Sequence, residues 1–335
     1  MTINISARVE FARQLVPGFL ASAVIAAAAT FLSEHYHAPV MLFALLLGMS
    51  MNFLSVESKC KPGIEFTARE ILRVGIALLG MRITFSQIAA LGWHPVILVL
   101  ISLVLTILVA MLVARAMGFE TLFGLLTGGA TAICGASAAL ALAAALPAHP
   151  GKEKATLFTV ICVSALSTLA MIIYPMIVNV LQLDASHAGV FLGATIHDVA
   201  QVVGAGYGMS QETGDVATVV KLIRVAMLLP VIVCATMITR ARGAQDGGKR
   251  PPLLPWFAVA FLLFAAINST GWVPSLVQNS ANEMSRWFLV IAISALGMKT
   301  QLKELATVGI KPIVLMLGET IFLATLVLLM MRWGL

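Results

Sequence analysis

Charged residues are scarce in this chain, since only 11% of its 335 residues are Asp, Glu, Lys or Arg. A soluble protein carries about 25%. The shortage excludes an ordinary soluble fold, and the 60% share of hydrophobic residues indicates a membrane protein. Apolar runs of about 20 residues, the length that crosses a bilayer, recur along the chain at 15–33, 95–114 and 312–330, among others.

Cysteines and catalytic motifs are also sparse. The four cysteines do not have the spacing of a zinc site or of a disulfide framework. The sequence holds no Walker A, G-x-S-x-G or H-E-x-x-H pattern. We therefore expect no metal, no cofactor, no catalytic residue and no enzymatic activity. Lys and Arg stand singly at the ends of apolar segments rather than in a patch, so the basic pI of 9.4 does not indicate a nucleic-acid partner.

These features predict an all-α polytopic membrane protein with about 9–11 transmembrane segments in a single domain, 1–335. Basic residues concentrate in cytoplasmic loops of membrane proteins, which places the N-terminal segment 1–14 and the linker 240–252 in the cytoplasm. Segments 120–147 and 187–209 either cross the membrane as broken helices or re-enter it as hairpins. The basic loop at 149–154 favours hairpins from opposite faces, because Lys152 and Lys154 then return to the cytoplasmic side.

Two pairs of similar segments indicate internal duplication. Residues 79–100 and 296–317 align without a gap, and the predicted topology makes them run in opposite directions. A weaker pair is 129–137 and 193–201. Inverted repeats are typical of secondary transporters. The order of the four pieces is nested rather than tandem, so either one similarity is chance or the duplication was rearranged.

The segment 126–146 is rich in Gly and other small residues, which favours a break in the helix. Close helix packing is the alternative explanation. Two features favour the break: Gly128 and Gly129 are paired, and polar or permissive residues cluster within the next two turns at Thr131, Cys134, Gly135 and Ser137. The small polar residues that follow are candidates for lining a substrate cavity; they are Thr131, Cys134 and Ser137.

A second segment, GATIHDVAQVVGAG (193–206), places His and Asp side by side between glycines. Thr195 and Asp198 have the spacing of a capping box, which predicts a helix that begins at Ile196 with Thr195 as its N-cap. Such a helix would carry His197 and Gln201 on one face of a substrate cavity, with His197 able to take a proton. The alternative is that Asp198 only caps the helix and His197 only packs.

Other ionisable residues fall inside or at the ends of apolar segments, where they are costly and usually functional. Arg224 lies deep in its segment, and Lys221 lies three residues before it on about the same face. For Arg73, the favoured interpretation is an ion pair with Glu70 at the membrane interface. Glu319 needs a partner or a proton, and either Arg224 or Arg73 could neutralise it.

At this point the chain resembles the YeiH-like sulfate exporter family, which consists of bacterial inner-membrane proteins. The resemblance rests on GGATAICGASAALA (128–141), GATIHDVAQVVGAG (193–206) and ALGMKTQL (295–302) and covers nearly the whole length. It implies kinship with sodium/proton antiporters and bile-acid symporters, with inverted repeats and helices broken at mid-membrane. It also implies a bacterial inner-membrane location and a sulfate-like substrate class.

The sequence therefore predicts a secondary transporter that exports a small inorganic or sulfur-containing anion, with coupling to protons or sodium left open. The predicted binding residues are Thr131, Cys134, Ser137, His197, Gln201 and Arg224, and the coupling or charge-pair residues are Asp198, Glu319, Arg73 and Lys221. A cation/proton antiporter is the first alternative, and an intramembrane enzyme is the alternative from another class. The lipid bilayer is an expected partner, and a homodimer is left open.

Overall fold

The computed structural model describes residues 5–36, 39–56, 58–146, 151–241, 256–300 and 309–334. All regular secondary structure in these ranges is helical. Five of the helices are long and apolar enough to cross a membrane: Arg13–Tyr36, His94–Ala116, Lys152–Val180, Gln211–Met237 and Ile310–Arg332. Shorter apolar helices accompany them, and the predicted all-α polytopic class is confirmed.

The chain folds as two compact units, each built from an N-terminal and a C-terminal stretch. The first unit comprises Met1–Ala89 and Trp256–Gln301, and the second comprises Ala90–Pro255 and Leu302–Leu335. The helices from the first stretch are α1 (Ile5–Tyr36), α2 (Val40–Ser50), α3 (Phe53–Val56), α4 (Lys61–Phe66), the π-helical turn η1 (Thr67–Ile71), α5 (Leu72–Leu79) and α6 (Phe85–Ala90), which ends at the boundary of the unit. Two more, α15 (Trp256–Ser269) and α16 (Ser275–Lys299), complete the first unit.

Glycines let the helices of the first unit approach closely. A Cβ built on Gly48 of α2 would lie 2.3 Å from the carbonyl oxygen of Ser294 in α16, so only a glycine fits there. At the surface of this unit, Arg73 donates to Glu70 at 2.7 Å, three residues earlier. The predicted ion pair is confirmed.

The second unit contains every other predicted binding residue. Its helices are α7 (His94–Ala116), α8 (Thr121–Ala132), α9 (Ala136–Ala145), α10 (Lys152–Val180), α11 (Ala185–Thr195), α12 (Val199–Met209), α13 (Gln211–Ala226), α14 (Leu228–Ala241) and α18 (Ile310–Arg332). The longest, α10, has 29 residues and therefore spans about 43 Å. It connects the end of α9 to the start of α11.

Helices α8 and α9 form a re-entrant hairpin, which we call hairpin 1. Glu120, which precedes α8, and Leu146, which follows α9, line the same cavity, so the two ends of the segment return to one place. A Cβ built on Gly129 of α8 would lie 2.3 Å from Cδ1 of Leu142 in α9. The paired glycines Gly128 and Gly129 both lie inside α8 and serve close packing, so of the two features that favoured a break, the pair does not make it.

Helices α11 and α12 form a second hairpin, hairpin 2. A Cβ on Gly189 near the start of α11 would lie 3.0 Å from the carbonyl oxygen of Thr213, and a Cβ on Gly206 near the end of α12 would lie 3.3 Å from the same atom. Both ends therefore pack against the start of α13. At the root, Asp184 caps α11 by accepting from the amides of Ser186 and His187, and the His187 amide holds the pKa of the Asp184 carboxyl below its usual value.

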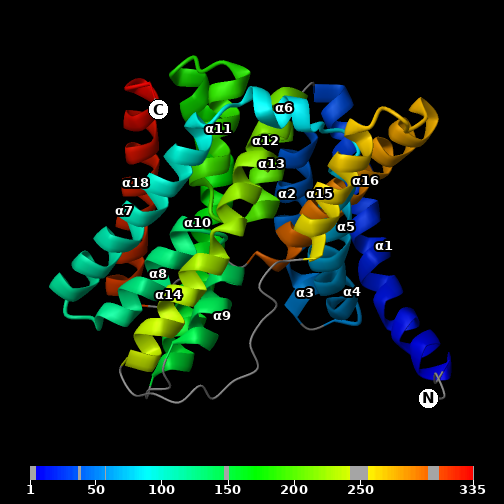
Figure 1. Ribbon diagram of the computed structural model, residues 1–335. Coiled ribbons are helices and arrows are strands. Elements are labelled where there is room, and N and C mark those ends of the chain that lie inside the picture. The colour runs from blue at the N-terminus through cyan, green and yellow to red at the C-terminus, as the bar shows by residue number, and fades with distance from the viewer. Residues whose placement is uncertain are drawn as a thin grey trace. The chain divides into compact units, whose positions relative to one another are not determined.

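The two hairpins enter the second unit from opposite ends. Hairpin 1 precedes the start of α10 and hairpin 2 follows its end, and Figure 1 shows them at opposite ends of this long helix. Between crossing broken helices and re-entrant hairpins, which the sequence left open, the structure shows hairpins. The family resemblance implied helices that are interrupted halfway across the membrane. In 121–145 and 185–209 the chain instead turns back on itself as a hairpin.

The segments that repeat in the sequence share local structure. Gly92 before α7 and the aligned Gly309 before α18 both have positive φ, at 68° and 90°, and each helix that follows has 23 residues. The two helices run antiparallel, because Phe119 just after α7 and Pro312 in the first turn of α18 line one cavity. Antiparallel copies are what an inverted repeat requires, and the full repeat relation stays a prediction.

Part of the predicted cytoplasmic segments lies outside the described residues. In the N-terminal segment 1–14 the described chain begins at Ile5, already within α1. The linker 240–252 falls outside from residue 242 onward.

Candidate functional site

The tips of the two hairpins meet inside the second unit, and we call this place the crossing. In hairpin 1, α8 ends at Ala132 and α9 begins at Ala136. Gly135 between them has φ 66° and ψ −133°, a backbone conformation that side-chain-bearing residues rarely adopt. A Cβ on Gly135 would lie 3.5 Å from the side chain of Asp198 in hairpin 2. The predicted break therefore exists, at the tip of the hairpin.

The tip of hairpin 2 is the sequence His197-Asp198. The prediction that Thr195 is the N-cap of a helix beginning at Ile196 was wrong. Thr195 is the last residue of α11, and its hydroxyl donates to the Phe191 carbonyl at 2.6 Å. Asp198 is the N-cap instead, because its extended backbone lets its carboxylate accept from the Val199 amide at 3.0 Å. His197 thus precedes the helix rather than lying on it.

The glycines of this segment lie inside helices and make no turn. Gly193 lies within α11, and Gly206 lies within α12. Their role is packing against α13: a Cβ on Gly193 would lie 2.5 Å from the Ala217 carbonyl oxygen. Gly204 likewise lies within α12.

Lys221 joins the two hairpin tips. It is fully buried on α13, and its ammonium donates to the carbonyls of Ile133 (2.8 Å), Ile196 (2.9 Å) and His197. The first of these carbonyls belongs to hairpin 1 and the other two belong to hairpin 2. An ammonium has three protons, so this arrangement uses all of them.

Arg224, one turn further along α13, makes the same kind of connection. Its Nε donates to the Ala132 carbonyl at 2.8 Å and its Nη2 donates to the Thr131 carbonyl at 2.8 Å, both in hairpin 1. Its Nη1 donates to the carbonyls of Gly193 (3.2 Å) and Ile196 (3.0 Å) in hairpin 2.

These contacts have a clear electrostatic reason. The last carbonyls of α8 and α11 have no partner within their own helices, and each helix carries partial negative charge at this end. Lys221 and Arg224 supply both the missing donors and the compensating charge at once. The predicted shared face of the two cations is confirmed, and its immediate function is to hold the hairpin tips together.

Glu319 lies on α18 and is only 3% exposed. Its two carboxylate oxygens accept from the hydroxyls of Thr127 (2.7 Å) and Thr131 (3.0 Å), which stand one turn apart on α8. Among the described residues of this unit no Lys or Arg nitrogen forms a salt bridge with Glu319, so Arg224 does not pair with it, and Arg73 has Glu70 as its partner within the first unit. The two threonine hydroxyls are thus the hydrogen-bond partners of the Glu319 carboxyl, whether it is ionised or carries a proton.

His197 is fully buried and reaches the same helix. Its Nε2 lies 2.9 Å from Oγ1 of Thr320, the residue after Glu319. The Thr320 hydroxyl also lies 2.8 Å from the Met316 carbonyl, and when its single proton is donated to that carbonyl, Nε2 is the donor in the contact with Thr320. The other ring nitrogen, Nδ1, is buried with no hydrogen-bond partner in the described part of the chain. It therefore presents a lone pair to the interior.

Gln201 and Asp198 are positioned by α10. The Gln201 amide nitrogen lies 3.5 Å from the Thr168 hydroxyl, and its oxygen has no partner among the described residues. The backbone amide of Asp198 donates to the Ser167 hydroxyl at 3.0 Å. Adjacent hydroxyls of α10 thus hold the start of α12.

The crossing has an accessible edge. Asp198 is half-buried, Ala136 is half-buried and Ser137 is exposed, whereas Cys134 is only 3% exposed. This edge carries the N-terminus of α9, which has no side-chain cap, beside the carboxylate that caps α12. Among the predicted residues, Ser137 is therefore exposed and Asp198 is half-buried. The others are buried, namely Thr131, His197, Gln201, Lys221 and Arg224.

Sequence reasoning missed the hydroxyl residues that organise the crossing, namely Thr127, Ser167, Thr168 and Thr320. Each is a single Ser or Thr in an apolar helix, where such residues commonly only bond their own backbone. The one available signal was the four-residue spacing of Thr127 and Thr131, which places both hydroxyls on one face of α8.

Comparison with known proteins gives consistent matches along the whole chain. Residues 17–316 match the family model of conserved hypothetical protein 698. A UPF0324 membrane protein of Chlorobaculum tepidum is 54% identical over 330 residues, which cover 98% of this chain and 92% of the relative. The UPF0324 membrane protein TauZ of Paracoccus denitrificans is 54% identical over 314 residues, 93% of each protein. A UPF0324 membrane protein of Rhizobium meliloti is 49% identical over 315 residues, 93% of this chain and 91% of the relative.

Proposed function

Because the chain belongs to the conserved hypothetical protein 698 family of multi-pass membrane proteins, and because its second unit contains two opposed hairpins, we propose that it is a secondary transporter. Its proposed cargo is a small inorganic or sulfur-containing anion such as sulfate or sulfite, exported in exchange for or together with protons. The observation that carries the proposal is the crossing, where discontinuous helices expose their ends inside the membrane. Transporters bind substrates and coupling ions at such places.

The N-terminus of α9 supports an anionic substrate. Its first amides have no intrahelical acceptor, its N-cap Gly135 has no side chain to accept from them, and the helix carries partial positive charge at this end. Ser137 adds a hydroxyl on the exposed side. An anion bound here would have amides and a hydroxyl as donors, with Lys221 and Arg224 beneath it.

The charges of the crossing support coupling to protons. Lys221 and Arg224 are balanced by Asp198 and Glu319 when both carboxyls are ionised. An anion that entered alone would leave the site with uncompensated negative charge, which is costly in a low-dielectric interior. One proton taken up for each negative charge restores the balance.

Asp198 is the proposed proton carrier. Its side chain already lies against Gly135 at the entrance to α9, so an ionised Asp198 competes with an anion for the same helix end. A proton on Asp198 removes that competition. Glu319, with both oxygens bound to threonine hydroxyls, is the second carboxyl able to carry a proton.

The proposal is tested by uptake of radiolabelled sulfate and sulfite into proteoliposomes with and without a pH gradient. We expect the gradient to drive uptake by the wild type and not by Asp198→Asn, whose side chain cannot titrate. Asp184→Asn is the matched control, because Asp184 caps α11 at the surface, away from the crossing. Arg224→Lys keeps the charge but loses the two-hairpin fork, and uptake should fall.

Two results would overturn this function. If the protein takes up neither sulfate nor sulfite and instead moves protons in response to a sodium gradient, the cation antiporter would be favoured. Chemical conversion of an anion by the purified protein in detergent, without any gradient, would favour an intramembrane enzyme.

A further inference from the structure

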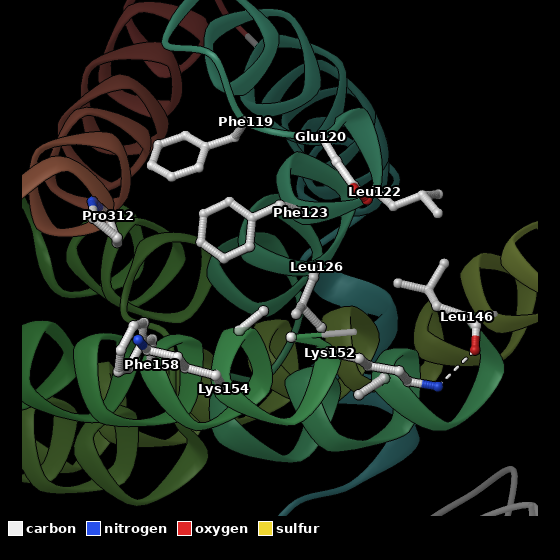
Figure 2. Close-up of a pocket in the computed structure, with 13 residues that line it drawn as sticks. Phe119, Glu120, Leu122, Phe123, Leu126, Leu146, Lys152, Lys154, Phe158 and Pro312 are labelled. Atoms are coloured by element: carbon white, nitrogen blue, oxygen red, sulfur yellow. Dashed lines mark hydrogen bonds between the residues drawn. The ribbon is translucent and has the colours of Figure 1, made fainter. Parts of the chain in front are cut away.

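A cavity lies in the same unit, at the root of hairpin 1. Its volume is about 270 Å³, near the lower end of the range for ligand pockets. Its wall is mainly aromatic and aliphatic, formed by Phe119, Leu122, Phe123, Leu126, Leu146, Phe158 and Pro312. Figure 2 shows the three phenylalanine rings and Pro312 on one side of the space, and Leu122, Leu146 and Lys152 on the other.

The cavity lies at the level where the membrane helices end. Its lining comes from the loop after α7, the start of α8, the end of α9, the start of α10 and the first turn of α18. Two of these helices, Lys152–Val180 and Ile310–Arg332, are membrane spans that begin at the cavity. A ligand here would therefore have one part at the depth of lipid headgroups and another at the depth of acyl chains.

Positive charge gathers at the polar rim. Lys152 and Lys154 both line the cavity, and Glu120 is the acidic residue among the lining side chains. The Lys152 ammonium donates to the Leu146 carbonyl at 2.7 Å, and the Lys154 ammonium lies 5.4 Å from the centre of the Phe158 ring. Both contacts leave ammonium protons available for a further acceptor, since each ammonium has three.

Helix ends add to this positive potential. The N-termini of α8, α10 and α18 all border the cavity, and their N-caps Glu120, Gly151 and Gly309 make no side-chain capping hydrogen bond. Each such end carries partial positive charge. The rim therefore favours an anion, while the wall favours an apolar chain.

We propose that this cavity binds an anionic phospholipid, with an acyl chain among the phenylalanine rings and the phosphate against Lys152 and Lys154. Basic pockets between transmembrane helices at the membrane surface recognise lipid headgroups in this way. A hydrated inorganic anion on its way to the crossing would need a polar wall, which the three phenylalanines, the leucines and the proline do not provide. The occupant is an amphiphile.

Lipid binding at this place would act on the crossing through hairpin 1. The cavity is lined by both ends of the hairpin, and Leu126 on its wall precedes Thr127, which donates to Glu319. A bound lipid would fill the space between α8, α10 and α18 and hold the root of the hairpin in place. This site is distinct from the crossing and does not depend on the proposed transport.

The test is native mass spectrometry of the full-length protein in detergent, titrated with phosphatidylglycerol or with phosphatidylcholine of the same acyl chains. We expect phosphatidylglycerol to bind about tenfold more tightly. Lys152→Met and Lys154→Met should each weaken its binding about fivefold, the effect of one basic residue at an anionic headgroup. Ala155→Phe, which fills the cavity from α10, should weaken the binding of both lipids.

Matched controls identify the site. Leu157→Phe places the same ring on an exposed position of α10 outside the lining, and Lys299→Met removes an exposed lysine from the other unit. Both should bind phosphatidylglycerol as the wild type does. Equal binding of the two lipids, or unchanged binding by Ala155→Phe, would overturn the proposal. If Ala155→Phe does not fold, Ala155→Leu replaces it with the same expectation.

Glycerol phosphate, the headgroup alone, should not compete with phosphatidylglycerol for the cavity. Competition would indicate a free-phosphate site and overturn the lipid assignment.

Discussion

Single hydroxyls decide what the buried ionisable residues of the crossing can do. When the Thr320 hydroxyl donates to the Met316 carbonyl, it can only accept from His197. Without it, the ring would lose the contact that fixes its proton on Nε2. The lone pair of Nδ1 would then no longer face the interior in a defined way.

We therefore expect Thr320→Val to release His197 into both neutral tautomers, while Thr320→Ser keeps the Nε2–H form. Nitrogen-15 NMR of histidine-labelled protein in detergent distinguishes the two ring nitrogens directly. The signal is assigned by its absence in His197→Gln, since the chain has six histidines. A wild-type His197 protonated only on Nδ1 would contradict the structure.

Arg224 offers a second prediction at this scale. Arg224→Met leaves the carbonyls of Thr131, Ala132 and Gly193 without this partner inside the protein. A buried acceptor that loses its donor costs about 1–3 kcal/mol, so the free energy of unfolding should fall by at least about 3 kcal/mol. Denaturant titration in mixed micelles measures it.

The control for this variant is Arg115→Met at the exposed end of α7, where a change below about 0.5 kcal/mol is expected. If both variants are equally stable, Arg224 does not hold the hairpins together.

At the scale of elements, the sequence predicted both interruptions, and the basic loop at 149–154 favoured opposed hairpins, but the residues at which the helices begin and end were not predicted. The glycine-rich stretches predicted a break, yet glycines also permit close packing. Gly128, Gly129 and Gly193 pack closely against neighbouring helices. Which glycine makes a turn depends on what lies beside it. Only Gly135 among the glycines of hairpin 1 has positive φ.

The capping box failed for a related reason. Thr195 can close the last turn of one helix as readily as it caps the next, and its hydroxyl bonds back to Phe191. The spacing of residues in the sequence does not show to which of the two helices the Thr195 hydroxyl is bonded. The deep cations could be found because charge in an apolar segment is rare, whereas their carbonyl partners lie 24 to 93 residues away in the chain.

The tip of hairpin 1 gives the prediction for this scale. Gly135→Ala forces a side chain into a strained backbone conformation, at a cost of about 1–3 kcal/mol, and moves the tip against Asp198. We expect lower stability and a loss of sulfate transport. Gly271→Ala is the control, since Gly271 also has positive φ, at 72°, but has open space around it. It should lose comparable stability and keep its transport, as measured by unfolding and by uptake.

At the scale of the whole molecule, the opposed hairpins make a topological prediction. Glu120 at the root of hairpin 1 and Glu212 after hairpin 2 are both exposed. Single cysteines at these positions, in a background without the four native cysteines, should react with an impermeant maleimide from opposite sides of the membrane. From the distribution of basic loops we expect Glu120 on the cytoplasmic side.

Inside-out and right-side-out vesicles make the comparison. Labelling of Glu120→Cys and Glu212→Cys from the same side would contradict the opposed entry of the hairpins. Labelling of Glu120→Cys from outside alone would reverse the predicted orientation and leave the hairpins as they are.

The proposed function requires an anion and a proton to share the crossing through Asp198. The most direct measurement follows the internal pH of proteoliposomes with a trapped indicator while a sulfate gradient is imposed. The wild type should move protons whenever sulfate moves, and Asp198→Asn should move sulfate, if at all, without a change in pH. Sulfate movement by the wild type at constant internal pH, or unchanged proton movement in Asp198→Asn, would contradict the account.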